Sequence, residues 1–226
     1  MMEKINNYFI ENQNRGLIKT FFRMFLGLLA TALAAYFTYS SGLYLKVSSG
    51  MSYAVLAIIE VIVVLVFSFM YKKLSPTMVT VLFFAYAFIN GITMAFIFAA
   101  FNLGTIANAF FTTALLFVGL ALYGHFTKRD MTKLGSIFSV ALIVGLIVSI
   151  INLFMNSSMV TIILDWVMLF VFCGLTAHDM NQIKYMQNYV NCDDEKLYIY
   201  CAMDLYLDFI NIFIRLLSIF ARNNRD

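Results

Sequence analysis

The amino-acid sequence predicts an all-α integral membrane protein, a bundle of seven transmembrane helices. Of the 226 residues, 62% are hydrophobic and only 12% are charged, and this charged share is about half that of a soluble domain. The apolar residues also gather in runs of about 20, the length at which a helix crosses the hydrocarbon core. A soluble domain would need a polar surface, whereas a surface that faces lipid does not.

Seven apolar runs follow one another with short polar connections. They cover residues 22–45, 51–71, 77–101, 104–126, 134–154, 159–182 and 197–220. The "ALA" segment at residues 32–34 resembles a signal-peptide cleavage site, but the apolar run continues to Phe37, which favours a transmembrane helix. The runs nearly fill the chain, so we expect one membrane domain over residues 1–226.

Lysine and arginine divide unevenly between the two sides of these helices. Eleven fall on the side of the N-terminus: Lys4, Arg15, Lys19, Arg23, Lys72, Lys73, Lys128, Arg129, Lys133, Lys184 and Lys196. Four fall on or toward the other side: Lys46, Arg215, Arg222 and Arg225. Because basic residues concentrate in cytoplasmic loops, we expect the N-terminus inside and the C-terminus outside.

The remaining composition excludes several classes of protein. The net charge of +3 comes from short clusters, which does not indicate a nucleic-acid partner. The three cysteines, Cys173, Cys192 and Cys201, lack the spacing of a zinc site or a disulfide framework, so we interpret them as structural.

Acidic residues inside the predicted spans are the candidate functional residues. Five of the twelve acids lie there: Glu60, Asp165, Asp179, Asp204 and Asp208. A charged side chain at the centre of a membrane helix costs about 2.5–3.5 kcal/mol, so such residues face a protein interior or a watery cavity. Asp165, beside Trp166 near the outer end of its span, is expected to be interfacial. Glu60, in the middle of its span, is a candidate pore or relay group.

The last three acids belong to one predicted hairpin, whose loop is centred near Asn191. Equal distance from that centre pairs Asp179 with Asp204, whereas a tilt of one helical turn brings Asp208 level with Asp179. Asp204 and Asp208, four residues apart, share a helix face. The spacing leaves both pairs open.

Either pair of acids has the same chemistry. Two carboxylates a few ångströms apart resist ionising together, so they share a proton or recruit a cation. Calcium prefers oxygen ligands of this kind. The structural alternative is an acid paired with a base such as Arg215, seven residues after Asp208.

Four motifs resemble one family of membrane proteins. The segments "GLTAHDMNQIK" (Gly174 to Lys184) and "LYLDFINIFIRLL" (Leu205 to Leu217) resemble the paired signatures of the transmembrane Bax inhibitor motif family, also called the Bax inhibitor-1 family. The segments "AIIEV" (Ala57 to Val61) and "FINGIT" (Phe88 to Thr93) extend the likeness, especially to bacterial members.

The resemblance implies a seven-helix bundle around a central helix, acting as a pH-sensitive calcium leak in a bacterial plasma membrane. Its di-aspartyl sensor maps onto Asp179 and Asp208, which would also be the calcium ligands, and its helix-two acid maps onto Glu60. Asp204 is an addition that we assign to the ion path. The implied partners are the lipid bilayer, calcium and protons, with no cofactor beyond the permeant ion.

The chain also departs from the family pattern. Where those members carry an arginine near the inner end of helix two, this chain has Tyr71 followed by Lys72 and Lys73, so a latch to the dyad would use lysine. His178 precedes Asp179 where the family often has tyrosine, and it could tune the proton affinity of Asp179 or be a neutral, hydrogen-bonded histidine. Arg215 is a further candidate for the latch.

Three other functional classes compete with the calcium leak. An intramembrane aspartyl protease is disfavoured because no GxGD motif follows Asp179 and no glycine opens the helix before Asp208, so we expect no enzyme. A proton-coupled transporter of another solute also uses buried acids. A membrane regulatory protein that transports nothing is the third class.

Overall fold

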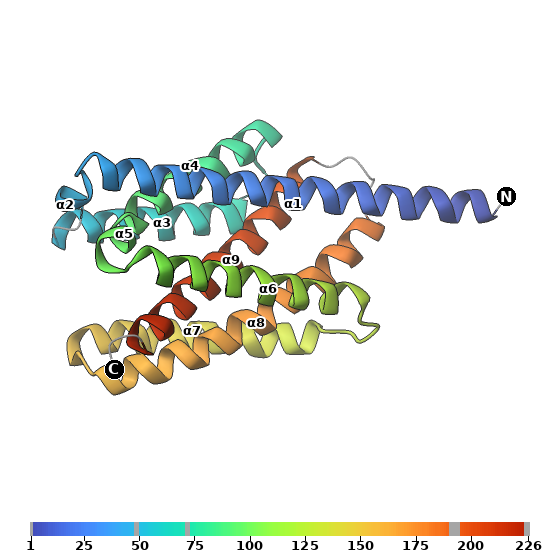
Figure 1. The fold of residues 1–226 in the computed structure, drawn as a ribbon. Helices are drawn as coiled ribbons and strands as arrows, with labels where there is room; N and C mark the ends of the chain where they lie inside the picture. Colours follow the sequence, from blue (N-terminus) through green and yellow to red (C-terminus); the bar gives the residue numbers. More distant parts are fainter. Residues whose placement is uncertain (1, 48–49, 71–72, 190–194, 224–226) are drawn as a thin grey trace. The chain divides into compact units, whose positions relative to one another are not determined.

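The computed structural model describes residues 2–47, 50–70, 73–189 and 195–223 (Figure 1). All regular elements in these ranges are helices. They are α1 (Met2–Ser40), α2 (Tyr44–Val47), α3 (Gly50–Met70), α4 (Pro76–Met94), α5 (Phe96–Ala100), α6 (Leu103–Phe126), α7 (Thr132–Met155), α8 (Ser158–Tyr189) and α9 (Glu195–Asn223). The all-helical fold class is therefore confirmed.

Six helical stretches are long and apolar enough to cross a membrane. They are Arg15–Ser40, Pro76–Ala100, Leu103–Phe126, Thr132–Met155, Ser158–Met186 and Glu195–Asn223. The second predicted span corresponds to α3, but its apolar part within the described ranges is the shorter segment Ile58–Met70. The predicted count of seven spans, the orientation and the central helix stay predictions.

Most boundaries lie within three residues of the predicted ones, and two helices differ more. The first span starts at Arg15 and ends at Ser40, earlier at both ends than residues 22–45, and α8 continues to Tyr189, beyond residue 182. The helix over 77–101 is interrupted at Ala95, which separates α4 from α5. At its start, Ser75 accepts a hydrogen bond from the Met78 backbone N–H and Pro76 occupies the first turn, a normal helix N-terminus.

The chain divides into two compact units. The first comprises Met1–Asn102 and Gln187–Tyr206. In it α4 packs against both α1 and α3 (Figure 1). Gly91 of α4 permits the close approach of α1, because a Cβ atom there would overlap the carbonyl oxygen of Thr31.

The second unit comprises Leu103–Met186 and Leu207–Asp226. Here α8 packs against α6 and α7 at small residues: a Cβ atom at Gly124 would overlap Ala177, and one at Gly145 would overlap Met168. The rings of Phe110 and Phe117 contact Phe209 of α9. The helix α9 thus contributes its first part to one unit and its second part to the other.

Candidate functional site

Glu60 lies on α3 in the first unit, and its carboxylate accepts two hydrogen bonds from α4. Thr93 Oγ1 donates to Glu60 Oε1 at 2.7 Å, and Asn90 Nδ2 donates to Oε2 at 3.5 Å. The side chain is half-buried, whereas Asn90 and Thr93 are buried. This arrangement supplies the polar partners that a carboxylate inside a span requires.

The hydrogen-bonded chain continues from Asn90 to two further helices. Tyr206 of α9 donates its hydroxyl hydrogen to Asn90 Oδ1 at 3.1 Å, and Thr31 Oγ1 of α1 lies 2.7 Å from the Tyr206 hydroxyl. Sequence reasoning did not select these partners of Glu60, although Asn90 and Thr93 lie in "FINGIT" and Tyr206 lies in "LYLDFIN". Three of the four motifs therefore meet around Glu60 in the fold.

Asp179 and Asp208 both belong to the second unit. Asp179 Oδ1 lies 2.8 Å from Nδ1 of its neighbour His178, and its side chain is 24% exposed. Asp208 is buried at 4% exposure and lies close enough to Cys173 of α8 to interact with it electrostatically. Asp204 is half-buried and belongs to the first unit, with Glu60.

The motif around Asp179 also joins α8 to the neighbouring helices of its unit. Asn181 Nδ2 donates to the Gly124 carbonyl at 3.1 Å, and Lys184 Nζ donates to the His125 carbonyl at 2.8 Å. Gln182 donates to Thr132 Oγ1 at 3.3 Å. Because the last carbonyls of α6 have no partner within their own helix, the side chains of Asn181 and Lys184 cap it. His178 lies against Gly135 of α7, where a Cβ atom would overlap its ring.

Asp165 is buried at 2% exposure. Its interfacial position in the membrane stays a prediction. Its Oδ1 accepts a hydrogen bond from Arg215 Nη1 at 3.0 Å, and its Oδ2 accepts one from Ser218 Oγ at 2.7 Å. Arg222 forms a second ion pair with Oδ2. Arg215, which the sequence linked to the aspartate pair, therefore contacts Asp165 in the structure.

The lysines proposed as a latch fall at the edge of the described ranges. Lys72 lies outside them, as does Tyr71. Lys73 is exposed in the turn after α3, where its backbone N–H donates to the Met70 carbonyl. Neither position tests the latch hypothesis. Among the residues that the structure describes, no three His, Cys, Asp or Glu residues are grouped to hold a metal ion.

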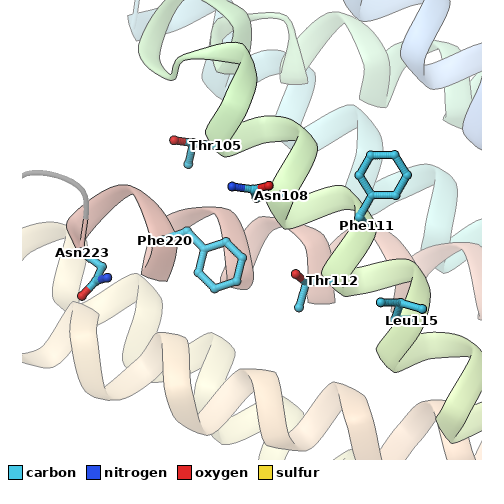
Figure 2. A pocket seen from close by; sticks show the side chains of 7 residues that line it. All are labelled: Thr105, Asn108, Phe111, Thr112, Leu115, Phe220 and Asn223. Atoms are coloured by element: carbon cyan, nitrogen blue, oxygen red, sulfur yellow. The ribbon is translucent and has the colours of Figure 1, made fainter.

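A crevice of about 390 Å³ lies in the second unit between α6 and the end of α9 (Figure 2). Three polar residues line it along one face of α6, together with apolar residues and the last turn of α9. The lining residues are Thr105, Asn108, Phe111, Thr112, Leu115, Phe220 and Asn223. This lining contains none of the acids predicted as a site.

These helices and their buried carboxylates define a multi-pass integral membrane protein with acidic groups inside its spans. The profile described as "Inhibitor of apoptosis-promoting Bax1" matches residues 13–225. The chain therefore belongs to the Bax inhibitor family, which confirms the resemblance of its motifs.

Several relatives match most of the chain. The inner membrane protein YbhL of Escherichia coli K12 is 34% identical over 88% of this chain and 87% of its own length. An uncharacterized protein of Borreliella burgdorferi is 32% identical over 95% of this chain and 94% of its own length. An uncharacterized membrane protein of Streptococcus pyogenes is 38% identical over 79% of this chain and 78% of its own length.

Proposed function

We propose that this protein is a pH-sensitive calcium leak channel of a bacterial plasma membrane. The observation that carries the proposal is the half-buried carboxylate of Glu60, held by Asn90 and Thr93 inside the helical bundle of the first unit. The carboxylate and the Thr93 hydroxyl beside it offer the hard oxygen atoms that calcium favours. We assign Glu60 and Asp204 to the ion path.

The proton sensor in this proposal is the pair Asp179 and Asp208, with calcium as a transient ligand when both are ionised. Their placement in one unit supports this pair over Asp179 with Asp204. His178, hydrogen-bonded to Asp179, would tune the sensor. We also propose that α3 is a seventh span, that the N-terminus is inside and the C-terminus outside, and that the bundle has a central helix.

Calcium entry into liposomes tests the proposal. Purified protein should admit calcium faster than empty vesicles, with a rate that changes between pH 5 and 8. Asp179→Asn and Asp208→Asn should shift or abolish the pH response, Asp204→Asn should alter it less, and Glu60→Gln should lower the rate while the pH response stays. No calcium entry at any of these pH values would refute the channel, and movement of another solute with protons would indicate a transporter.

Asp130, in the connection after α6, provides a matched control carboxylate. Hydrogen bonds from Thr132, followed by the charges of Lys133 and His178, hold the pKa of Asp130 below its usual value of 3.8. A lowered pKa in the folded state stabilises the fold above the usual value, and that stabilisation is lost only as the pH falls through the lowered pKa. Asp130 therefore stays ionised from pH 5 to 8 and is not the sensor, so a pH response should persist in Asp130→Asn.

A further inference from the structure

A single hydrogen-bonded chain joins four helices of the first unit to the Glu60 carboxylate. It runs from Thr31 of α1 through Tyr206 of α9 and Asn90 of α4 to Glu60 of α3. We propose that Tyr206 and Thr31 are positioning residues for Glu60, and that the chain transmits displacements of α9 to this carboxylate. The structural part of this proposal is independent of the calcium leak, and its consequence for flux rests on the proposed function.

The direction of the hydrogen bonds follows from counting hydrogens. Asn90 donates its amide hydrogen to Glu60, so its Oδ1 is the acceptor for the single hydroxyl hydrogen of Tyr206. The Tyr206 oxygen must then accept from Thr31. Each member therefore donates toward the carboxylate, and the charge of Glu60 strengthens the donors behind it because hydrogen bonds in a row polarise one another.

Two hydroxyl groups around this chain have an alternative acceptor: Thr31 at its start and Thr93, the second donor to Glu60. The Thr31 hydroxyl lies 2.9 Å from the Ala87 carbonyl and 3.0 Å from the Gly27 carbonyl. The Thr93 hydroxyl lies 2.8 Å from the Asn90 carbonyl. If a proton or a cation satisfies Glu60, both hydroxyls can turn to backbone oxygens and stay paired. The buried Asn90 amide, which donates to Glu60 Oε2, therefore carries most of the cost when Glu60 changes partners.

Packing fixes the position of the Tyr206 hydroxyl relative to α9. The residue is 0% exposed, and its ring lies edge-on to Phe83 at 5.8 Å and to Tyr86 at 5.9 Å between centroids. Gly27 of α1 permits the ring to pack closely against α1, since a Cβ atom there would lie 3.3 Å from the Tyr206 ring. The hydroxyl therefore moves only when α9 moves, and α9 carries Asp208 two residues further on.

The amide in the middle determines what the chain can do. A hydroxyl can accept one proton and pass on another, but the amide of Asn90 has no hydrogen on its accepting atom and holds both of its own on nitrogen. The chain therefore positions Glu60 and does not conduct protons to it. A displacement of α9 therefore changes the position of Glu60 on α3, and no proton passes along the chain.

A double-mutant cycle in thermal unfolding tests the chain without any transport assay. Tyr206→Phe should lower the melting temperature of the purified protein by about 2–4 °C, as the loss of one buried hydrogen bond predicts. In the Glu60→Gln background the same change should lower it by less than half as much, because the charge that strengthens the chain is absent. An equal effect in both backgrounds would overturn the proposal.

Matched variants separate the chain from general packing. Tyr200→Phe removes a hydroxyl from another tyrosine of α9, one that stacks on Phe67 of α3 at 6.0 Å, and its effect should be equal in both backgrounds. Thr31→Ser keeps the hydroxyl and should preserve the coupling between Tyr206 and Glu60, whereas Thr31→Val should reduce it. Loss of coupling in both Thr31 variants would contradict the role of the hydroxyl.

Flux supplies a readout that a structural role alone would not change. Tyr206→Phe should raise the calcium concentration for half-maximal entry by about five- to tenfold, the equivalent of one hydrogen bond between neutral groups, while the maximal rate changes less than twofold. An unchanged half-maximal concentration would contradict positioning. If the unmodified protein admits no calcium, the channel proposal fails, and the melting cycle still decides the chain.

Discussion

The carboxylate of Asp165 balances the charge of two guanidinium groups inside the second unit. Arg215 and Arg222 are 24% and 33% exposed, whereas the Asp165 side chain is 3% exposed. Taking a carboxylate out of water costs several kcal/mol, and the two ion pairs and the Ser218 hydroxyl offset that cost. Removing one partner of such a cluster leaves the others buried without compensation.

We therefore expect Asp165→Asn to destabilise the protein by about 3 kcal/mol, the lower end of the range for a broken buried pair because the arginines are partly exposed. For a chain of this size the melting temperature should fall by about 6–12 °C. Arg222→Gln, which keeps the bonds of Asp165 to Arg215 and Ser218, should cost less than half as much. Similar melting temperatures for the two variants would show that Asp165 is not the centre of the cluster.

At this scale the sequence identified which residues were unusual, but not which residues they contact. The cost of a charge in lipid singled out Glu60 and Asp165 without a structure. The spacing of Arg215 from Asp208 predicted a shared helix face, yet the side chain bonds to Asp165 of α8. Spacing along one helix fixes the face of a residue, whereas the partner depends on the height and rotation of the neighbouring helix.

The helices of the second unit approach one another at glycines, and the two glycines in the middle and end of α6 differ in their surroundings. A Cβ atom at Gly124 would overlap the carbonyl oxygen of Ala177 and crowd Met180 of α8, whereas nothing lies within 4 Å of a Cβ atom at Gly119. A backbone oxygen cannot turn aside as a flexible side chain can, so α6 and α8 would have to separate.

Gly124→Ala should therefore destabilise the protein by about 1–3 kcal/mol, the cost of overpacking, and weaken the hydrogen bond from Asn181 to the Gly124 carbonyl. Gly119→Ala on the same helix should cause no loss, because alanine is the better helix former and the space is open. Thermal unfolding of the two variants in one detergent makes the comparison. Equal destabilisation by both would rule out the close contact of α6 with α8.

The helix ends agree with the predicted apolar runs where contact with lipid sets the length of the helix. They differ from those runs where polar side-chain contacts extend a helix. The helix α8 continues to Tyr189 because Asn181, Gln182 and Lys184 bind the end of α6 and the start of α7, which stabilises turns beyond the apolar run. The helix is interrupted at Ala95, which is neither proline nor glycine, so the sequence does not indicate this interruption. Hydropathy measures transfer into lipid, not these side-chain contacts.

For the whole molecule, the number of times that the chain crosses the membrane determines on which sides its termini lie. Six stretches meet the requirement of length and apolarity within the described ranges. An even number of crossings places both termini on one side, and an odd number places them on opposite sides. The seventh predicted span is α3, whose single charged residue is Glu60, so the count depends on whether this helix crosses.

Two observations favour α3 as a crossing helix. It has 21 residues, enough to span about 30 Å at 1.5 Å per residue. Its acid is also satisfied by Thr93 and Asn90 of α4, a helix that meets the requirements for a span. A carboxylate with partners inside the protein does not have to reach water, so Glu60 does not prevent insertion.

Alkaline phosphatase, which is active only outside the cytoplasm, decides whether α3 crosses the membrane in a bacterial host. Fused after Gly42, between α1 and α3, it should be active, because one crossing from an inside N-terminus ends outside. Fused after Ser75, between α3 and α4, it should be inactive, since Lys72 and Lys73 hold that connection in the cytoplasm. Equal activity of the two fusions, at equal expression, would place α3 and Glu60 outside the set of spanning helices. Such a result would also remove Glu60 from a path across the membrane. The predicted topology and the proposed function therefore both depend on α3.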